Sequence, residues 1–136
     1  MSSILSIAIS GMQAAATRLQ VSANNVANVL STGALPDEQG NYPPGAQRAY
    51  VPQRVEQADL IDGGTRAIVS GLWPSYVPVY DPGSPYANAD GQVAYPNVDL
   101  TEEAIQQLVA RYTFAANARV VTAYDQIVKS LIDIKA

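Results

Sequence analysis

The first 36 residues contain a single charged side chain, Arg18, yet they carry a regular heptad of apolar residues. Large apolar side chains recur every seven positions, at Leu5, Met12, Leu19 and Val26, and smaller residues lie between them, at Ala8, Ala15, Ser22 and Val29. Alternating steps of three and four residues are typical of a coiled-coil seam. The sequence therefore predicts a long N-terminal helix whose apolar face packs against another helix.

The outer face of this helix lacks the charges that water-exposed helices normally carry. Its outer row holds small, neutral residues, namely Ser3, Ser10, Thr17, Asn24 and Ser31. A second apolar row, consisting of Ile7, Ala14 and Val21, lies away from the main seam. We expect such a helix to be surrounded by other helices on several sides. From periodicity alone, an ordinary antiparallel helix pair within one folded chain fits equally well.

The chain divides into three zones, residues 1–33, 34–98 and 99–136. The middle zone contains all nine prolines, which exclude a long helix there and favour short strands. We expect strands at residues 50–58, 66–72 and 76–80. Gly33 and Pro36 mark the expected end of the first helix.

The third zone predicts a second long helix. Asp99, Leu100, Thr101 and Glu102 have the spacing of a capping box, and no Gly or Pro follows before Ile134. The apolar positions of this helix form one stripe: Ile105, Leu108, Tyr112, Ala116, Val120, Ala123, Ile127, Leu131 and Ile134. We therefore predict a mainly α fold, in which the terminal helices form a coiled-coil-like pair that buries both seams and serves as one axial core module. A Pro/Gly-rich, partly β insert joins them, and the helices are expected to order fully only on assembly.

Composition excludes several classes of function. The chain has no cysteine and no histidine, which excludes a Cys/His zinc site and a Ser-His-Asp triad. Its net charge of −4, without a basic stripe, argues against nucleic acid as a partner. The start lacks the basic region of a cleaved secretory signal and is too polar to insert into a membrane. Asp81, Asp90 and Asp99 are not placed by the sequence in one pocket, so no enzyme activity and no cofactor are expected.

Three segments resemble a known family. Residues 3–34, with "SANNVAN" at Ser22–Asn28, are similar to the N-terminal signature of flagellar rod, hook and hook-associated axial proteins. Residues 114–134, "FAANARVVTAYDQIVKSLIDI", resemble the matching C-terminal motif. Residues 79–104, "VYDPGSPYANADGQVAYPNVDLTEEA", are most similar to a short proximal rod protein within this family. Residues 34–73 match only loosely.

The resemblance implies a structural subunit of the proximal rod of the bacterial flagellar basal body. Such a subunit polymerises through its terminal helices into a helical tube that spans the periplasm and transmits torque. The implied partners are copies of itself, other rod proteins and the flagellar type III export apparatus, which would export the chain without a cleaved signal. A soluble helical adaptor or export chaperone that binds a partner helix is the alternative.

The heptad and the resemblance together predict an assembly interface on both helices. Its expected residues are Leu5, Met12, Leu19, Val26, Ser10, Thr17, Asn24, Asn25, Asn28, Asn117, Val120, Ile127 and Leu131. The asparagines are expected to hydrogen-bond to neighbouring subunits, although Asn24, Asn25 and Asn28 would also suit a frayed helix end. The segment Asn88–Gly91 is expected to be a turn rather than a calcium loop. Trp73 and its neighbouring tyrosines form either a satellite core or a contact surface.

Overall fold

The computed structural model describes residues 4–135. The elements in chain order are α1 (Ile4–Ala27), β1 (Gln53–Asp59), β2 (Thr65–Gly71), β3 (Tyr76–Tyr80), β4 (Gln92–Pro96) and α2 (Leu100–Lys135). Along the sequence, a long helix therefore stands at each end and short strands lie between them. This order confirms the predicted fold class. Ser3 of the predicted outer row lies outside the described residues.

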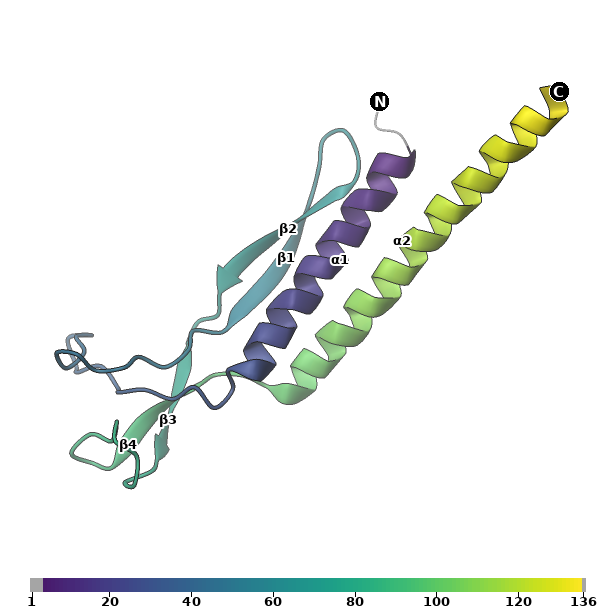
Figure 1. Ribbon diagram of the computed structural model, residues 1–136. Coiled ribbons are helices and arrows are strands. Elements are labelled where there is room, and N and C mark those ends of the chain that lie inside the picture. The colour runs from purple at the N-terminus through teal and green to yellow at the C-terminus, as the bar shows by residue number, and fades with distance from the viewer. Residues whose placement is uncertain (1–3, 136) are drawn as a thin grey trace.

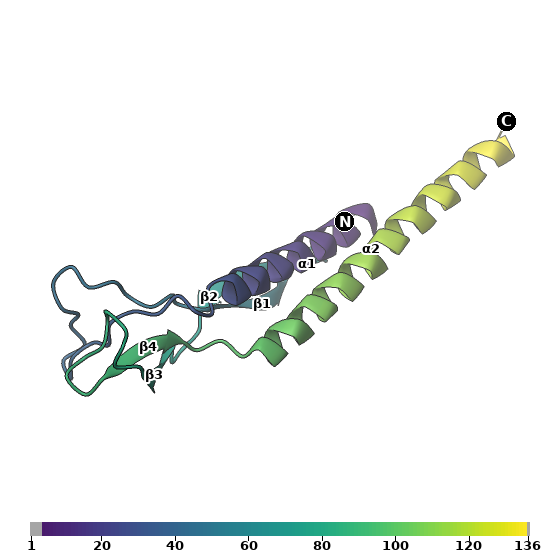
Figure 2. The same cartoon turned by 60° about the horizontal axis from the view of Figure 1, so that its bottom comes forward.

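The two helices lie side by side and antiparallel, and the β1–β2 hairpin lies along α1 on the side away from α2 (Figure 1). The β3–β4 hairpin and its loops gather at the end of the molecule where α1 ends and α2 begins. With 36 residues against 24, α2 is the longer helix. Its C-terminal part continues well beyond the N-terminal end of α1 (Figure 2).

Both sheets are two-stranded antiparallel hairpins. The β1–β2 register runs from Gln53 opposite Gly71 to Asp59 opposite Thr65, and β3 pairs with β4 from Tyr76 opposite Pro96. The three expected strands are present, but β4 was not predicted, because it follows the Asn88–Gly91 turn within a segment rich in turn residues. It is nevertheless the most buried strand, with Val93 completely enclosed.

The predicted turn at Asn88–Gly91 is confirmed. Gly91 has a positive φ of 72°, and its N–H donates to the carbonyl of Asn88 over 3.0 Å. The Asn88 side-chain oxygen accepts from the N–H groups of Asp90 and Gln92, as in an Asx-turn. This turn directs the chain into β4.

The first helix ends earlier than expected, and Gly33 has a different role from the predicted helix stop. α1 ends at Ala27, where the Asn28 side chain donates to the carbonyl of Asn24 over 2.9 Å. Gly33 instead pairs with Ala94, and a Cβ on Gly33 would lie 2.2 Å from the backbone nitrogen of Ala49. Two backbone segments therefore meet at Gly33 at a distance that only glycine permits.

The predicted cap of the second helix is confirmed at its aspartate. The Asp99 carboxylate accepts from the N–H of Thr101 over 2.8 Å and from that of Glu102 over 3.2 Å. These bonds satisfy two of the backbone donors that a helix start leaves free. Glu102 and Glu103 add negative charge to the first turn, where the helix dipole favours it.

The hydrophobic core of the single chain consists mainly of small side chains. Its buried apolar residues are Ala8, Ala14, Ala15, Val21, Ala34, Val93, Ala94 and Ala110. In contrast, Leu19 is 46% exposed and Val26 is 36% exposed. The expectation that the pair of helices buries the row of large residues is therefore wrong for these two positions. The row of small residues is buried instead.

The apolar stripe predicted on α2 is also exposed rather than buried against α1. Tyr112 is 70% exposed, Leu131 is 62% exposed, and Ile105, Leu108 and Ile127 are each about half exposed. The buried apolar residue of α2 is Ala110. The helices thus meet through small and polar residues, which leaves their large apolar side chains on the surface.

Candidate assembly interface

The two helices approach each other closely at Gly11 and Asn117. A Cβ on Gly11 would lie 2.7 Å from the amide atoms of Asn117, so only glycine fits there without a shift. The Asn117 side chain donates to the carbonyl of Thr113 over 2.9 Å, one turn earlier in α2. Asn117 therefore lies within the helix pair of one chain, where its short side chain helps the helices to approach closely.

Asn25 is the centre of a buried polar cluster at the C-terminal end of α1. Its side-chain nitrogen donates to the Gln53 carbonyl over 2.7 Å and to the Glu103 carboxylate over 2.6 Å. Its side-chain oxygen accepts from the Tyr50 hydroxyl over 3.0 Å and from the Gln53 N–H over 2.9 Å. With an exposure of 2%, Asn25 uses two donors and two acceptors inside the chain. The expectation that this amide bonds to a neighbouring subunit is therefore corrected.

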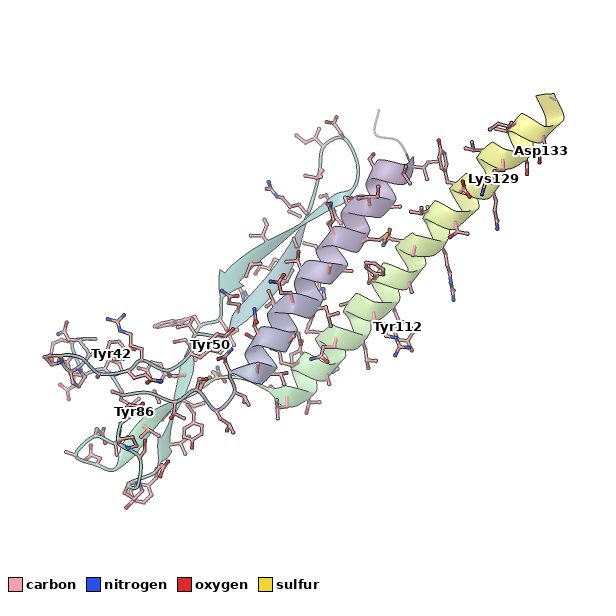
Figure 3. The ribbon with its side chains drawn as sticks, viewed as in Figure 1. Tyr42, Tyr50, Tyr86, Tyr112, Lys129 and Asp133 are labelled. Carbon is pink, nitrogen blue, oxygen red and sulfur yellow. The ribbon has the colours of Figure 1, made fainter. Side chains whose placement is uncertain are left out.

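The Asn25 cluster joins three parts of the chain. Tyr50 lies beside the end of α1 (Figure 3), Gln53 opens β1, and Glu103 lies in the first turn of α2. Burial raises the pKa of the Tyr50 hydroxyl, and the nearby Glu103 carboxylate raises it further. The hydroxyl therefore stays protonated and can donate to Asn25 at neutral pH.

Two further polar side chains, Ser22 and Arg18, fix α1 against its neighbours. Ser22 donates to the Glu103 carbonyl over 3.0 Å and accepts from the Gln107 amide over 3.2 Å. Arg18 donates to the side-chain oxygens of Gln106 in α2 and Gln57 in β1. The single charge of α1 thus links the second helix to the hairpin, a role that the sequence pattern did not reveal.

The predicted outer row of α1 divides between two environments. The Ser10 hydroxyl accepts from the N–H of Thr65 over 3.1 Å, so the β1–β2 hairpin covers this position within the chain. Thr17 donates to the Gln13 carbonyl of its own helix, and Asn24 is exposed. Ser10 therefore does not face outward as expected, whereas Asn24 remains available to a neighbour.

The predicted interface residues that remain open are mainly the large apolar ones. Leu5 and Met12 are half-buried, and Leu19 and Val26 are exposed along α1. Val120, Ile127 and Leu131 are exposed along the C-terminal half of α2. Lys129 and Asp133 lie on the part of α2 that extends beyond α1 (Figure 3). Lys129 pairs there with Asp125 over 2.6 Å.

The aromatic residues of the insert are divided between surface and interior. Trp73 is 85% exposed and Tyr80 is also exposed, so neither belongs to a satellite core. Tyr86 is half-buried, and its hydroxyl donates to the Gln47 side chain over 2.9 Å. Of the two readings, a contact surface therefore fits Trp73 and Tyr80, whereas Tyr86 ties two loops of the same chain together.

The described residues, 4–135, carry exposed apolar side chains of the kind found on association surfaces. In this part of the chain, no group of three or more His, Cys, Asp or Glu side chains is placed to hold a metal ion. Within the same residues, neither helix is both long and apolar enough to cross a membrane. What the described molecule does present is a pair of helices with apolar outer faces.

Two family models match the ends of the chain. The model described as "Flagella basal body rod protein" matches residues 5–34, which include α1. The model described as "Flagellar basal body rod FlgEFG protein C-terminal" matches residues 89–134, which include β4 and nearly all of α2. The fold and these matches define the chain as an axial protein of the flagellar rod class.

Curated relatives narrow this class. The chain is 33% identical to the flagellar basal-body rod protein FlgC of Agrobacterium fabrum over 131 residues, which cover 94% of this chain and 90% of the relative. It is 38% identical to FlgC of Yersinia enterocolitica over 86% of this chain and 84% of the relative. It is 35% identical to FlgC of Salmonella typhimurium over 94% of this chain and 93% of the relative. The chain belongs to the flagellar basal-body rod protein FlgC family, and it is a structural rod protein rather than an enzyme.

Proposed function

We propose that the chain is a subunit of the proximal rod that polymerises through α1 and α2 into a helical tube and transmits torque passively. Its partners in this proposal are copies of itself, other rod proteins and the flagellar type III export apparatus, through which it leaves the cell without a cleaved signal. Contacts between different surfaces of successive copies generate a helical array when the rotation from one copy to the next does not close a ring.

One observation carries this proposal, namely the position of the large apolar side chains on the outer faces of both helices. Burying a Leu, Ile or Val side chain contributes roughly 1.5–3 kcal/mol. The single chain leaves Leu19, Ile127 and Leu131 about half exposed, so about half of this contribution is still to be gained. Packing α1 and α2 of several copies together would bury these residues.

The shape of the helix pair supports the same proposal. Gly11 lies against Asn117 in an antiparallel pair, so Ile4 lies opposite about residue 124. Residues 125–135 of α2 therefore extend past the described part of α1, by about 16 Å at the helical rise. This projecting segment carries Ile127 and Leu131, and it reaches beyond its own chain toward neighbouring copies.

The proposal is tested by Leu19→Asp in a strain that lacks its own copy of the gene. Because Leu19 is 46% exposed in the single chain, the free energy of unfolding of the purified protein should fall by only about 1–1.5 kcal/mol, about half of what full burial of a leucine contributes. In an assembled rod, however, the new carboxylate would be buried without a partner, at a cost of several kcal/mol per copy. We expect the variant to be synthesised and folded, but to form no rods and to leave the cells non-motile.

Leu19→Met is the matched control, since it keeps an apolar side chain of similar size and should swim normally. Ile127→Asp repeats the test on the projecting part of α2, beyond the level of Ile4, at a position that is 59% exposed. Normal rods built from both aspartate variants would contradict assembly through these faces. If a strain with one of these variants assembles rods and swims, the helix that carries the substitution is not part of the interface.

A further inference from the structure

The turn between β1 and β2, residues 60–64, presents an apolar side chain on a fixed support. Ile61 is fully exposed, at 106% of its reference area, and Leu60 beside it is 41% exposed. The Leu60 N–H donates to the carbonyl of Gly64 over 3.1 Å, and the Gly63 N–H donates to the carbonyl of Leu60 over 2.9 Å. We call residues 60–64 the Ile61 knob.

The Ile61 knob is held against α1. Gly64 has a φ of +93°, and a Cβ on it would lie 2.5 Å from the Ser10 hydroxyl. The next residue, Thr65, donates its N–H to the same hydroxyl over 3.1 Å. Surface turns are usually built from polar residues, whereas this turn holds an isoleucine in open solvent at a fixed place.

A hollow of about 380 Å³ lies near the opposite end of the same hairpin. Apolar side chains line part of it, namely Val21 of α1, Val55 of β1 and Leu72, which follows β2. Its volume is near the lower end of the range for small-ligand pockets. It therefore suits one or two aliphatic side chains on a turn, and it is too small for a helix.

We propose that the Ile61 knob of one copy seats in this hollow of the next copy. The inference rests on the proposed function and names one contact within that assembly. A knob and a hollow at opposite ends of one hairpin make a contact between different surfaces, which can repeat from copy to copy in one direction, as a helical array requires. From Val55 to Ile61 the strand advances about 20 Å, so successive copies are offset by a distance of that order along α1.

The charges around the two surfaces give the knob an orientation. Asp59 and Asp62 flank the knob, while Arg18 and Arg54 line the α1 and β1 side of the hollow. The α2 side of the hollow is acidic, with Asp99, Glu102 and Glu103. The knob therefore enters with Asp59 toward the two arginines.

Arg54 is able to exchange partners at small cost. It pairs with Glu56 over 2.8 Å within its own chain, and both side chains are 59% exposed. Exposed ion pairs of this kind contribute little, about 0–1 kcal/mol. An incoming carboxylate from the next copy can therefore replace Glu56.

Disulfide crosslinking tests the contact cleanly, because the chain has no cysteine of its own. The variant Ile61→Cys/Val55→Cys is produced beside the unmodified chain so that rods form, and isolated basal bodies are oxidised mildly. A disulfide requires Cβ atoms within about 4.5 Å, so the bond forms only where knob and hollow meet. We expect a ladder of covalent multimers on a non-reducing gel, which collapses to the monomer on reduction.

The control pair Ile61→Cys/Leu30→Cys places the second thiol at a position that is 77% exposed but does not line the hollow. Each single-cysteine variant gives a dimer at most, so neither produces a ladder. Failure of the Ile61/Val55 pair to crosslink beyond the control pair would overturn the proposed contact.

Ile61→Asp provides a second measurement. Since Ile61 is fully exposed, the purified variant should unfold like the parent, while Ile61→Val should behave normally in every assay. We expect Ile61→Asp to reduce motility at least tenfold. If it swims normally, the knob does not dock, although the Leu19→Asp result can still support the proposed function. Failure of the knob contact and failure of the proposed function are therefore distinguishable.

Discussion

At the scale of single residues, Asn25 shows what a sequence motif can and cannot reveal. The "SANNVAN" segment pointed to a group of amides with a specific role, and Asn25 does make four hydrogen bonds. However, which of two adjacent asparagines turns inward depends on Tyr50 and on Gln53 at the start of β1, both far away in the sequence. Heptad position alone does not contain that information, so Asn25 was assigned to a neighbouring subunit rather than to its own chain.

Replacing Asn25 should therefore destabilise the single chain itself. Asn25→Ala leaves the Tyr50 hydroxyl, the Gln53 N–H and the Gln53 carbonyl without their partner in a partly buried place. Because an unsatisfied buried polar group costs about 1–3 kcal/mol, we expect a loss of roughly 2–4 kcal/mol in the free energy of unfolding. Urea denaturation of the purified protein measures this loss.

The adjacent substitution Asn24→Ala is the matched control. Asn24 is exposed, and its side chain is on the surface of the same helix, so its replacement should change the free energy of unfolding by about 0.5 kcal/mol or less. Equal effects at the two positions would show that the Asn25 cluster does not stabilise the chain.

At the scale of elements, the periodicity predicted both helices but not the faces through which they meet. Residues in steps of three and four form several parallel rows on one helix, and each row has the same period. The rows at Leu5–Val26 and at Ala8–Ser22 are thus equally regular. Small residues such as Gly11 and Ala15 let the second helix approach closely, which turns the large residues outward. Helix phase was therefore set by packing that a single row does not encode.

The unequal length of the helices gives a prediction for the isolated chain. Residues 125–135 of α2 extend past the described part of α1, whereas residues 103–117 are tied to it by Asn25, Ser22, Arg18 and Gly11. A helix segment without tertiary packing is marginal in water. In amide hydrogen exchange of the purified protein, we expect residues 125–135 to exchange at least tenfold faster than residues 103–117. Uniform protection along α2 would show that the projecting segment is stable without a neighbour.

At the scale of the whole molecule, the fold class followed from three sequence features: two long segments free of proline, and a proline-rich middle. The strand β4 and the knob-and-hollow pair did not follow, because both depend on contacts between distant segments. The resulting molecule has a small core of mostly alanine and an outer surface that carries its large apolar residues. Such a distribution is the reverse of that in a self-sufficient globular domain, and it suits a subunit that completes its packing in an assembly.

The central claim is that the outer faces of α1 and α2 are open in the single chain and covered in the rod. The chain has no cysteine, so the single variants Leu19→Cys in α1 and Ile127→Cys in α2 place one thiol on each of these faces, at positions 46% and 59% exposed. Ala34→Cys, at a position 8% exposed, is the control that stays protected in both states. The measurement is the rate of maleimide labelling in the purified monomer and in isolated basal bodies. We predict labelling of both surface thiols in the monomer, at least tenfold slower labelling in the rod, and full recovery after dissociation. Equal labelling rates in monomer and rod would contradict the claim.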